Sequence, residues 1–272
     1  MRKLLTALLL LAATAAAAQT TPEGFKAAYE RQTAAVGTTG LGVKSILESW
    51  NAAFPNDTLM LEAVFYYNLE KGRSYVAITR PEKKYLGRDP LFSAKDSTGK
   101  KVNYFQIPLY DEDYFASAQK ALDKAINLAP NNIGYLFSEI TSLLDYEGES
   151  PDMAATALLN LIDRHYSEHP RWNYFGQPFS HEDFVDSVKE YCVALWKLGT
   201  PVGYESFYNV SSRMVKAEPK DPGFLDNVGA YWQVAKKDKK KAAKFYQKAL
   251  KLDPEDYAAN QNMKFISNSN KK

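Results

Sequence analysis

The sequence has little cysteine, no net charge beyond its first residues and few long apolar runs, and each shortage excludes a class of protein. Cys192 is the only cysteine in 272 residues, so no disulfide can form within the chain. The formal charge of +2 comes from Arg2 and Lys3, and the chain after residue 18 has 32 basic and 32 acidic residues. This balance excludes a general electrostatic affinity for nucleic acid. A hydrophobic fraction of 45% and a charged fraction of 24% exclude a collagenous or disordered chain.

The longest apolar run lies at the N-terminus and has the pattern of a secretory signal peptide. A basic start, Arg2-Lys3, precedes the apolar residues Leu4–Ala12 and the small residues Ala16–Ala18. The run is shorter than the roughly 20 apolar residues that span a bilayer. We therefore predict that residues 1–18 are cleaved and that the mature chain, 19–272, is soluble and has no transmembrane span. An exported chain without disulfides, and without an N-terminal cysteine to carry a lipid, favours a periplasmic or secreted location.

A repeated pattern runs through the rest of the chain. Four segments each combine a helix end, a proline and polar capping residues, and a fifth, weaker copy ends at Pro170. The prolines, at 55, 130, 170, 219 and 254, are 75, 40, 49 and 35 residues apart. A repeat of 34 residues leaves excesses of 41, 6, 15 and 1 residues. The three larger ones fall in 72–111, around 147–152, and in 171–180 with its flanks. These three segments are therefore predicted to be insertions.

The last repeat carries the clearest family pattern. Leu225, Val228, Gly229 and Trp232 are followed at fixed spacing by Ala242, Tyr246, Ala249 and Pro254. This spacing resembles the tetratricopeptide repeat (TPR), although Leu225 stands where tryptophan is expected and the loop between the helices is one residue longer. The chain as a whole resembles exported bacterial TPR proteins of unassigned activity. The resemblance implies an all-α solenoid of about five helix–turn–helix pairs, with a final capping helix near 256–267.

The periodicity and capping residues also predict individual elements. The segment 72–111 is expected to be non-helical, because strand-like residues at 74–79, 91–94 and 102–107 surround a turn at 96–99. It predicts a small β-hairpin or loop flap carried on the solenoid. Helices are expected near 22–36, 42–54, 58–71, 113–128, 132–146, 151–167, 181–198, 202–217, 222–236, 239–252 and 256–267.

Three motifs that suggest chemistry are better explained structurally. His165–His169 matches the H-x-x-E-H pattern of inverted zinc proteases, but Pro170 forces His169 out of the helical conformation that two metal ligands would need. Both histidines are therefore expected to be ordinary surface positions. Gly37–Ser45 lacks the G-K-[ST] of a phosphate loop, and Cys192 lies on the apolar face of its helix. We predict no enzyme, catalytic residue, metal or cofactor.

Two kinds of binding remain open. The first is a non-catalytic scaffold that binds a protein or peptide on its concave face, where similarity to the TPR arrangement places Phe137, Thr141, Asp226 and Gln233. The alternative is a glycan- or ligand-binding protein that uses the aromatic segment 171–179 and the 72–111 flap. Its stacking residues would be Trp172, Tyr174 and Phe175, unless these rings are buried between repeats.

A basic stripe marks the C-terminal end of the chain. Residues 213–272 have a net charge of +7, against −7 for residues 19–212. Most of the lysines at helical spacing are expected to form a solvated face, with an acidic partner as the functional alternative. The stripe consists of Lys237, Lys241, Lys244, Lys248 and Lys251.

Overall fold

The computed structural model describes residues 20–269, and the predicted signal peptide lies outside these described residues. They contain eleven helices and five short strands. The expected fold class, an all-α succession of helix–turn–helix pairs with a β insertion, is confirmed. Every expected helix is present, with ends within two residues of those predicted. The chain divides into two compact units, residues up to 75 with 108–135, and residues 76–107 with 136–272.

The first unit packs four helices in sequence. These are α2 (Pro22–Val36), α3 (Val43–Ala53), α4 (Thr58–Gly72) and α5 (Glu112–Leu128), and each packs against the next in the chain. Trp50 lies at the centre of the core, with its ring parallel to that of Phe25. Its indole N–H donates to the Asp57 carboxylate at 2.9 Å, and Asp57 also caps the N-terminus of α4. A core residue and a helix cap are thus tied together.

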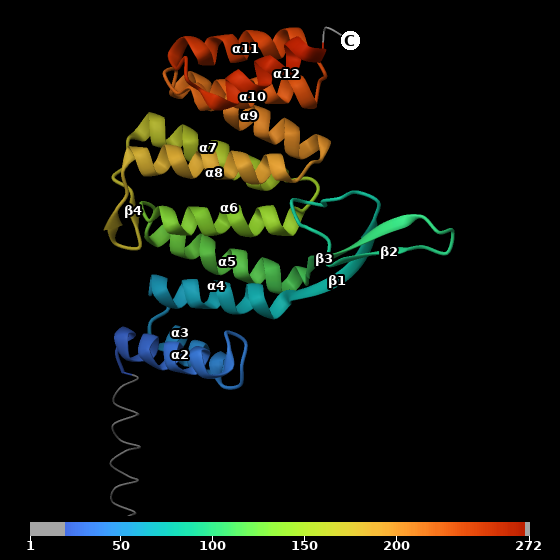
Figure 1. Cartoon of the computed structure of the whole chain (residues 1–272). Helices are drawn as coiled ribbons and strands as arrows, with labels where there is room; N and C mark the ends of the chain where they lie inside the picture. The colour runs from blue at the N-terminus through green and yellow to red at the C-terminus, as the bar shows by residue number, and fades with distance from the viewer. Residues whose placement is uncertain (1–19, 270–272) are drawn as a thin grey trace, which may run out of the picture. The chain divides into compact units, whose positions relative to one another are not determined.

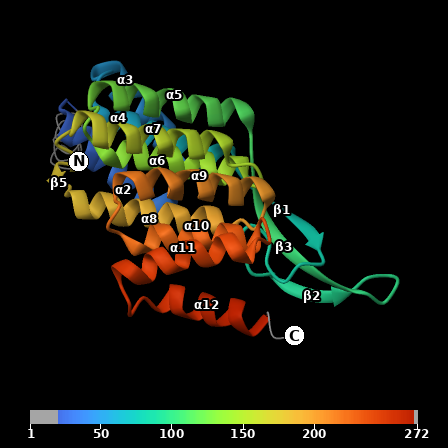
Figure 2. The ribbon, with the colours of Figure 1, turned by 90° about the horizontal axis from the view of Figure 1, so that it is seen from above.

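The second unit contains the remaining helices, and their starts follow from the sequence. Ser180 and Asp183 form the expected capping box at the start of α8. Thr200 and Asp221 cap α9 and α10, each followed by proline in the first turn. The helices, labelled in Figure 2, are α6 (Ile133–Glu147), α7 (Asp152–Glu168), α8 (His181–Lys197), α9 (Pro201–Ala217), α10 (Pro222–Val234), α11 (Lys239–Leu252) and α12 (Tyr257–Ser269).

The insertion forms a three-stranded sheet rather than a simple hairpin. Its strands are β1 (Arg73–Arg80), β2 (Phe92–Lys95) and β3 (Lys101–Tyr110), in the order β1-β3-β2. The loop before β2 is fixed to the second unit, since Arg88 pairs with Asp145 of α6 at 2.7 Å and Tyr85 bonds to Glu149. In Figure 1 the turn between β2 and β3 points away from the helices of this unit.

A second insertion, smaller and between α7 and α8, is a two-stranded hairpin. Its strands are β4 (Asn173–Tyr174) and β5 (Gln177–Pro178), which pair in antiparallel fashion. Within residues 20–269, no helix combines the length and the apolar character that crossing a bilayer would require.

Candidate functional site

Two residues predicted for the groove and the predicted aromatic segment come together in the second unit. The Phe137 ring of α6 packs against Phe179 at the end of the small hairpin, with ring centroids 5.7 Å apart, and against Tyr191 of α8 at 5.8 Å. The Tyr191 hydroxyl donates to the backbone carbonyl of Phe137 at 3.1 Å and also lies 3.1 Å from the hydroxyl of Thr141. The α6 surface and the hairpin therefore form one site rather than two.

The row of rings continues from Phe179 to the tip of the hairpin. Tyr174 lies 6.2 Å from Phe179 and 4.8 Å from Phe175, the latter in an edge-to-face arrangement. Phe137, Phe179 and Tyr191 are half-buried, whereas Tyr174 is 47% exposed and Phe175 37% exposed. We call these five residues the aromatic patch. Its inner rings are packed against the helices, and its outer two face solvent.

Phe175 occupies an unfavourable backbone conformation at the tip. The two-residue turn joining β4 and β5 has φ of +48° at Phe175 and +86° at Gly176. Turns with two positive φ angles strongly prefer asparagine, aspartate or glycine. Placing another residue in this region costs roughly 1–3 kcal/mol, and residues with such strain cluster at functional sites. An exposed aromatic ring is thus held at a position that its backbone disfavours.

Trp172 anchors this hairpin to the helices. Its side chain is only 5% exposed, lies beneath the guanidinium of Arg164 at 4.7 Å, and donates its indole N–H to Nδ1 of His165 at 2.9 Å. Its carbonyl accepts from the Phe179 amide, which closes the base of the hairpin. As a stacking residue for a ligand, Trp172 is therefore misassigned, because its ring is packed inside the protein.

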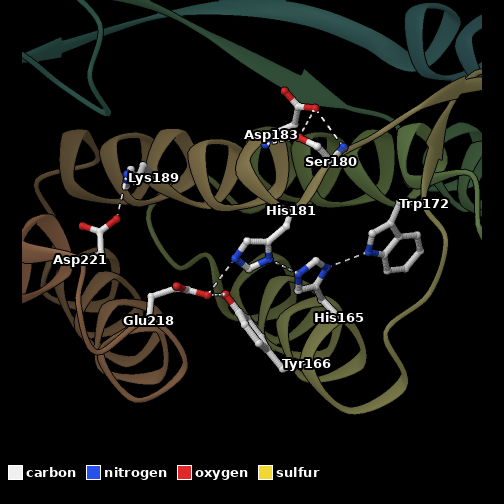
Figure 3. Close-up of polar contacts among 9 residues, drawn as sticks. All are labelled: His165, Tyr166, Trp172, Ser180, His181, Asp183, Lys189, Glu218 and Asp221. Carbon is white, nitrogen blue, oxygen red and sulfur yellow. Dashed lines mark hydrogen bonds and ion pairs between the residues drawn. The ribbon is translucent and has the colours of Figure 1, made fainter.

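Behind the anchor, four side chains continue a hydrogen-bond chain (Figure 3). Nε2 of His165 lies 3.0 Å from Nδ1 of His181, and Nε2 of His181 lies 3.1 Å from a carboxylate oxygen of Glu218. The Tyr166 hydroxyl donates to the same Glu218 oxygen at 2.6 Å. The chain links α7, the first residue of α8 and the residue that ends α9. The hairpin anchor is thereby connected to three helices of the unit.

Burial controls the electrostatics of this chain. The His165 ring is stacked on Phe184 at 3.7 Å, with the rings nearly parallel. Burial, together with the neighbouring His181 and His169, lowers the pKa of His165 to about 4, with Glu218 acting in the opposite direction. Burial also raises the pKa of Tyr166, which in addition donates to Glu218. His165 and Tyr166 therefore stay neutral near pH 7.

The H-x-x-E-H motif is divided by the end of α7. His169 has φ of +48° and ψ of +52°, a left-handed conformation beyond the helix, as Pro170 predicts. His165 is not the surface residue that we expected, because it is buried and both of its ring nitrogens have partners. Among residues 20–269, no group of three or more histidine, cysteine, aspartate or glutamate side chains is arranged to hold a metal ion.

Cys192 has the character of a packing residue. Its side chain is buried on α8, with the sulfur 3.6 Å from the Ser211 hydroxyl. Burial raises the pKa of the thiol to about 12, so little thiolate is present near neutral pH. The site described here therefore has no activated cysteine nucleophile.

The other two predicted groove residues lie in the last helix pair and have different neighbours. Asp226 is 7% exposed, and its Oδ1 has no hydrogen-bond partner among the described residues. Burial, together with the nearby Asp256 carboxylate, raises the pKa of Asp226 to about 8. Gln233 is half-buried and accepts a hydrogen bond from the Tyr246 hydroxyl at 3.0 Å. Asp226 is thus a core residue and not an open groove position, because it is enclosed where α10 meets the start of α12.

Most lysines of the basic stripe lie on α11, and all are exposed. Lys241 lies over the ring of Trp232, with its ammonium 3.2 Å from the centroid, and Lys248 lies over Phe245 at 5.2 Å. Lys237 departs from the predicted helical spacing, because it precedes α11 and has φ of +56°.

Several residues of the site carry no sequence signal that would assign them. The capping box places His181 at the start of α8, and Glu218 precedes a repeat-ending proline. Neither position indicates that the two side chains meet. Phe179 and Tyr191 are ordinary aromatic residues until α6 is packed beside them.

Comparisons with known proteins find similarity only at the level of structure. No protein-family model matches the sequence, and a search of curated proteins finds no match. The chain is similar to the solved structure of MamA residues 41 to the end from Desulfovibrio magneticus RS-1, with a TM-score of 0.37 and 14% identity. It is similar to the MamA RS-1 ArsTM double mutant at 0.38 and 15%. Each match covers 86% of this chain and 95% of the other. With TM-scores this low, the fold assignment rests on the helices and their packing described above.

Proposed function

We propose that the protein is an exported, non-catalytic scaffold that binds a protein or peptide through the aromatic patch. The observation that carries the proposal is the row of five rings ending in two exposed side chains, one of them at a strained turn. Clustered aromatic residues beside packed neighbours are typical of the few positions that dominate the energy of protein interfaces. The partner is expected to offer apolar side chains to Tyr174 and Phe175.

The location of the patch agrees with the repeat arrangement implied by the TPR resemblance. Phe137 and Tyr191 belong to α6 and α8, the first helices of their pairs, whose surfaces form the concave face in such repeats. The predicted signal peptide supports export to the periplasm or exterior. The exposed lysines of α11 support a second contact with an acidic part of the partner.

The test selects binding peptides and asks whether they need the patch. A random peptide library is selected on the immobilised protein, and enriched peptides are then measured against the Tyr174→Ser/Phe175→Gly double variant. We expect affinity to fall at least about tenfold, since interface anchors contribute roughly 2 kcal/mol or more. The matched control is Phe265→Ser, which removes a 58% exposed ring from α12.

Three outcomes of this test have different meanings. Peptides that bind both the wild type and the double variant equally would contradict the proposed site. If Phe265→Ser lowers peptide affinity as much as the double variant does, the peptides adhere non-specifically to exposed rings. If no peptide binds but an oligosaccharide on a glycan array does, and the double variant abolishes that binding, the glycan-binding alternative replaces the proposal.

A further inference from the structure

The hydrogen-bond chain behind the hairpin has only one consistent arrangement of protons. The indole nitrogen of Trp172 can only donate, so Nδ1 of His165 must accept and the proton of neutral His165 must lie on Nε2. Nε2 of His165 then donates to Nδ1 of His181, which must also be unprotonated. The proton of neutral His181 therefore lies on Nε2 and points to Glu218. The His165–His181 bond, with His165 in this tautomer, therefore requires that His181 carry only the proton on Nε2.

A second proton on His181 cannot be accommodated without losing one hydrogen bond of this chain. With both nitrogens of His181 protonated, its Nδ1–H faces Nε2–H of His165. If His165 changes tautomer to accept this proton, its Nδ1–H faces the Trp172 indole N–H instead. The pKa of His165, lowered to about 4, means that His165 itself does not take up the proton at mildly acidic pH. The conflict therefore removes either the His165–His181 bond that orients His165 or the Trp172–His165 bond of the anchor itself.

The groups around His181 do not supply another acceptor for its Nδ1–H. Glu218, at the end of α9, faces the opposite ring nitrogen and also accepts from Tyr166 of α7. Arg213 of α9 is paired with Asp163 of α7, and Asp221, before α10, is paired with Lys189 of α8. On α8 itself, the Asp183 carboxylate is bonded to Ser180. His169 lies past the end of α7, and Glu182 is exposed in the first turn of α8.

We infer that protonation of His181 controls how firmly the hairpin that carries Tyr174 and Phe175 is held against the helices. With one proton, His181 completes the chain from Trp172 to Glu218 and the hairpin is held against the helices. With two protons, His181 keeps its contact with Glu218, and either the His165–His181 or the Trp172–His165 hydrogen bond is lost. The side chain of His181 is 57% exposed, so a second proton can reach its ring from solvent.

This inference deepens the proposed function, on which it depends only for its effect on binding. Loss of one of these hydrogen bonds increases the population of molecules in which the hairpin is open by roughly five- to tenfold. A partner that needs the closed hairpin to engage both exposed rings would then bind more weakly by a similar factor once His181 carries two protons.

The test follows the Trp172 indole proton by nuclear magnetic resonance, and no partner is needed. Isotope-labelled protein is titrated from about pH 7.5 to pH 5, and solvent exchange of this proton is corrected for its intrinsic pH dependence. We expect exchange to become about five- to tenfold faster as His181 takes up its proton. The Trp50 indole, which donates to Asp57, serves as the internal reference and should not follow this transition.

Because the chain has only three histidines, variants at His181 and His169 can assign the pH response to one of them. His181→Gln keeps an acceptor for His165 and a donor for Glu218 but cannot titrate, so it should abolish the pH response. His169→Gln should leave the response intact. The ring signals of His165 and His181 in the wild type provide a measure that does not depend on any variant folding.

Clear results would overturn the inference. The inference is refuted if the exchange rate of the Trp172 indole proton does not change over this pH range. It is also refuted if that rate changes with a midpoint different from that of the His181 ring signals. A response that persists in His181→Gln would also refute it. The proposed function can fail separately, because peptide binding at pH 7.5 is lost or retained whatever the indole proton does.

Discussion

Gly229 is the position where a single methyl group should most directly test the packing of the last helix pair. A Cβ atom there would lie 2.5 Å from Cε1 and 2.8 Å from Cδ1 of Tyr246 on α11. Carbon atoms in favourable contact are about 3.5–4.0 Å apart, so the ring or the helix must move by roughly 1 Å. Tyr246 is fully buried, and its hydroxyl is bonded to Gln233. The ring therefore has little freedom to move.

The expected cost of Gly229→Ala combines two opposing effects. Overpacking a core typically costs about 1–3 kcal/mol, whereas alanine in a helix interior gains about 1 kcal/mol over glycine. Contacts of 2.5 and 2.8 Å with a buried ring place the cost in the upper half of this range, at about 2–3 kcal/mol. The net loss is therefore about 1–2 kcal/mol, which lowers Tm by roughly 2–8 °C in a protein of this size. Gly229→Leu should cost more, because additional carbons enter the same contact.

Thermal unfolding followed by circular dichroism measures this effect, and a second background isolates its cause. In a Tyr246→Leu variant the ring is gone, so Gly229→Ala should be neutral or stabilising by up to about 1 kcal/mol. A Tm unchanged by Gly229→Ala in the wild type, or the same loss in both backgrounds, would show that α10 and α11 do not meet in this way.

Three further predictions concern the site and the buried carboxylate. Phe175→Gly should leave the free energy of unfolding unchanged within about 1 kcal/mol or increase it, because relief of the positive φ offsets the lost ring contacts. A larger loss of stability in chemical denaturation would show that the Phe175 ring stabilises the fold. Trp172→Phe should destabilise by about 1–3 kcal/mol, since it leaves buried Nδ1 of His165 without a donor, and a denaturation midpoint equal to that of the wild type would contradict the anchor. Asp226 has its pKa raised to about 8, so the folded state holds a proton that the unfolded state releases near pH 4, and stability is lost as pH rises between these values. Asp226→Asn should remove this loss, and its advantage over the wild type in unfolding experiments should grow from pH 4 to pH 8; an advantage that does not change with pH would contradict the shift.

The helices could be predicted from the sequence because their ends are encoded locally. Ser180 and Asp183 satisfy the first backbone amides of α8 whatever the rest of the chain does. Asp221 followed by Pro222 starts α10 in the same way. Gly229 and Tyr246 also lie in a pattern whose spacing reflects direct packing of two adjacent helices. Such features need only contacts between near neighbours in the chain.

The site could be predicted only in fragments, because its residues meet through packing of separate segments. The sequence pairs His165 with His169 by spacing, but the partner of His165 is His181, across the hairpin. The aromatic segment could not be divided by composition into buried and exposed rings. Packing of Trp172 against α7 makes that division. Asp226 was assigned to a groove because the repeat pattern takes no account of the helix end that covers it.

Exposure alone would not have selected the aromatic patch. Tyr257 and Phe265 of α12 are 77% and 58% exposed, more than either outer ring of the patch, but neither has a positive φ. Scattered exposed apolar residues are common on protein surfaces and need no functional explanation. Phe175 differs because its positive φ is unfavourable for a residue other than glycine, so other contacts must stabilise this conformation. The buried Trp172 and its hydrogen-bond chain are the structure that does so. A turn with asparagine or glycine would be more stable and would not need this anchor, and the proposed binding role of the exposed ring would account for that cost.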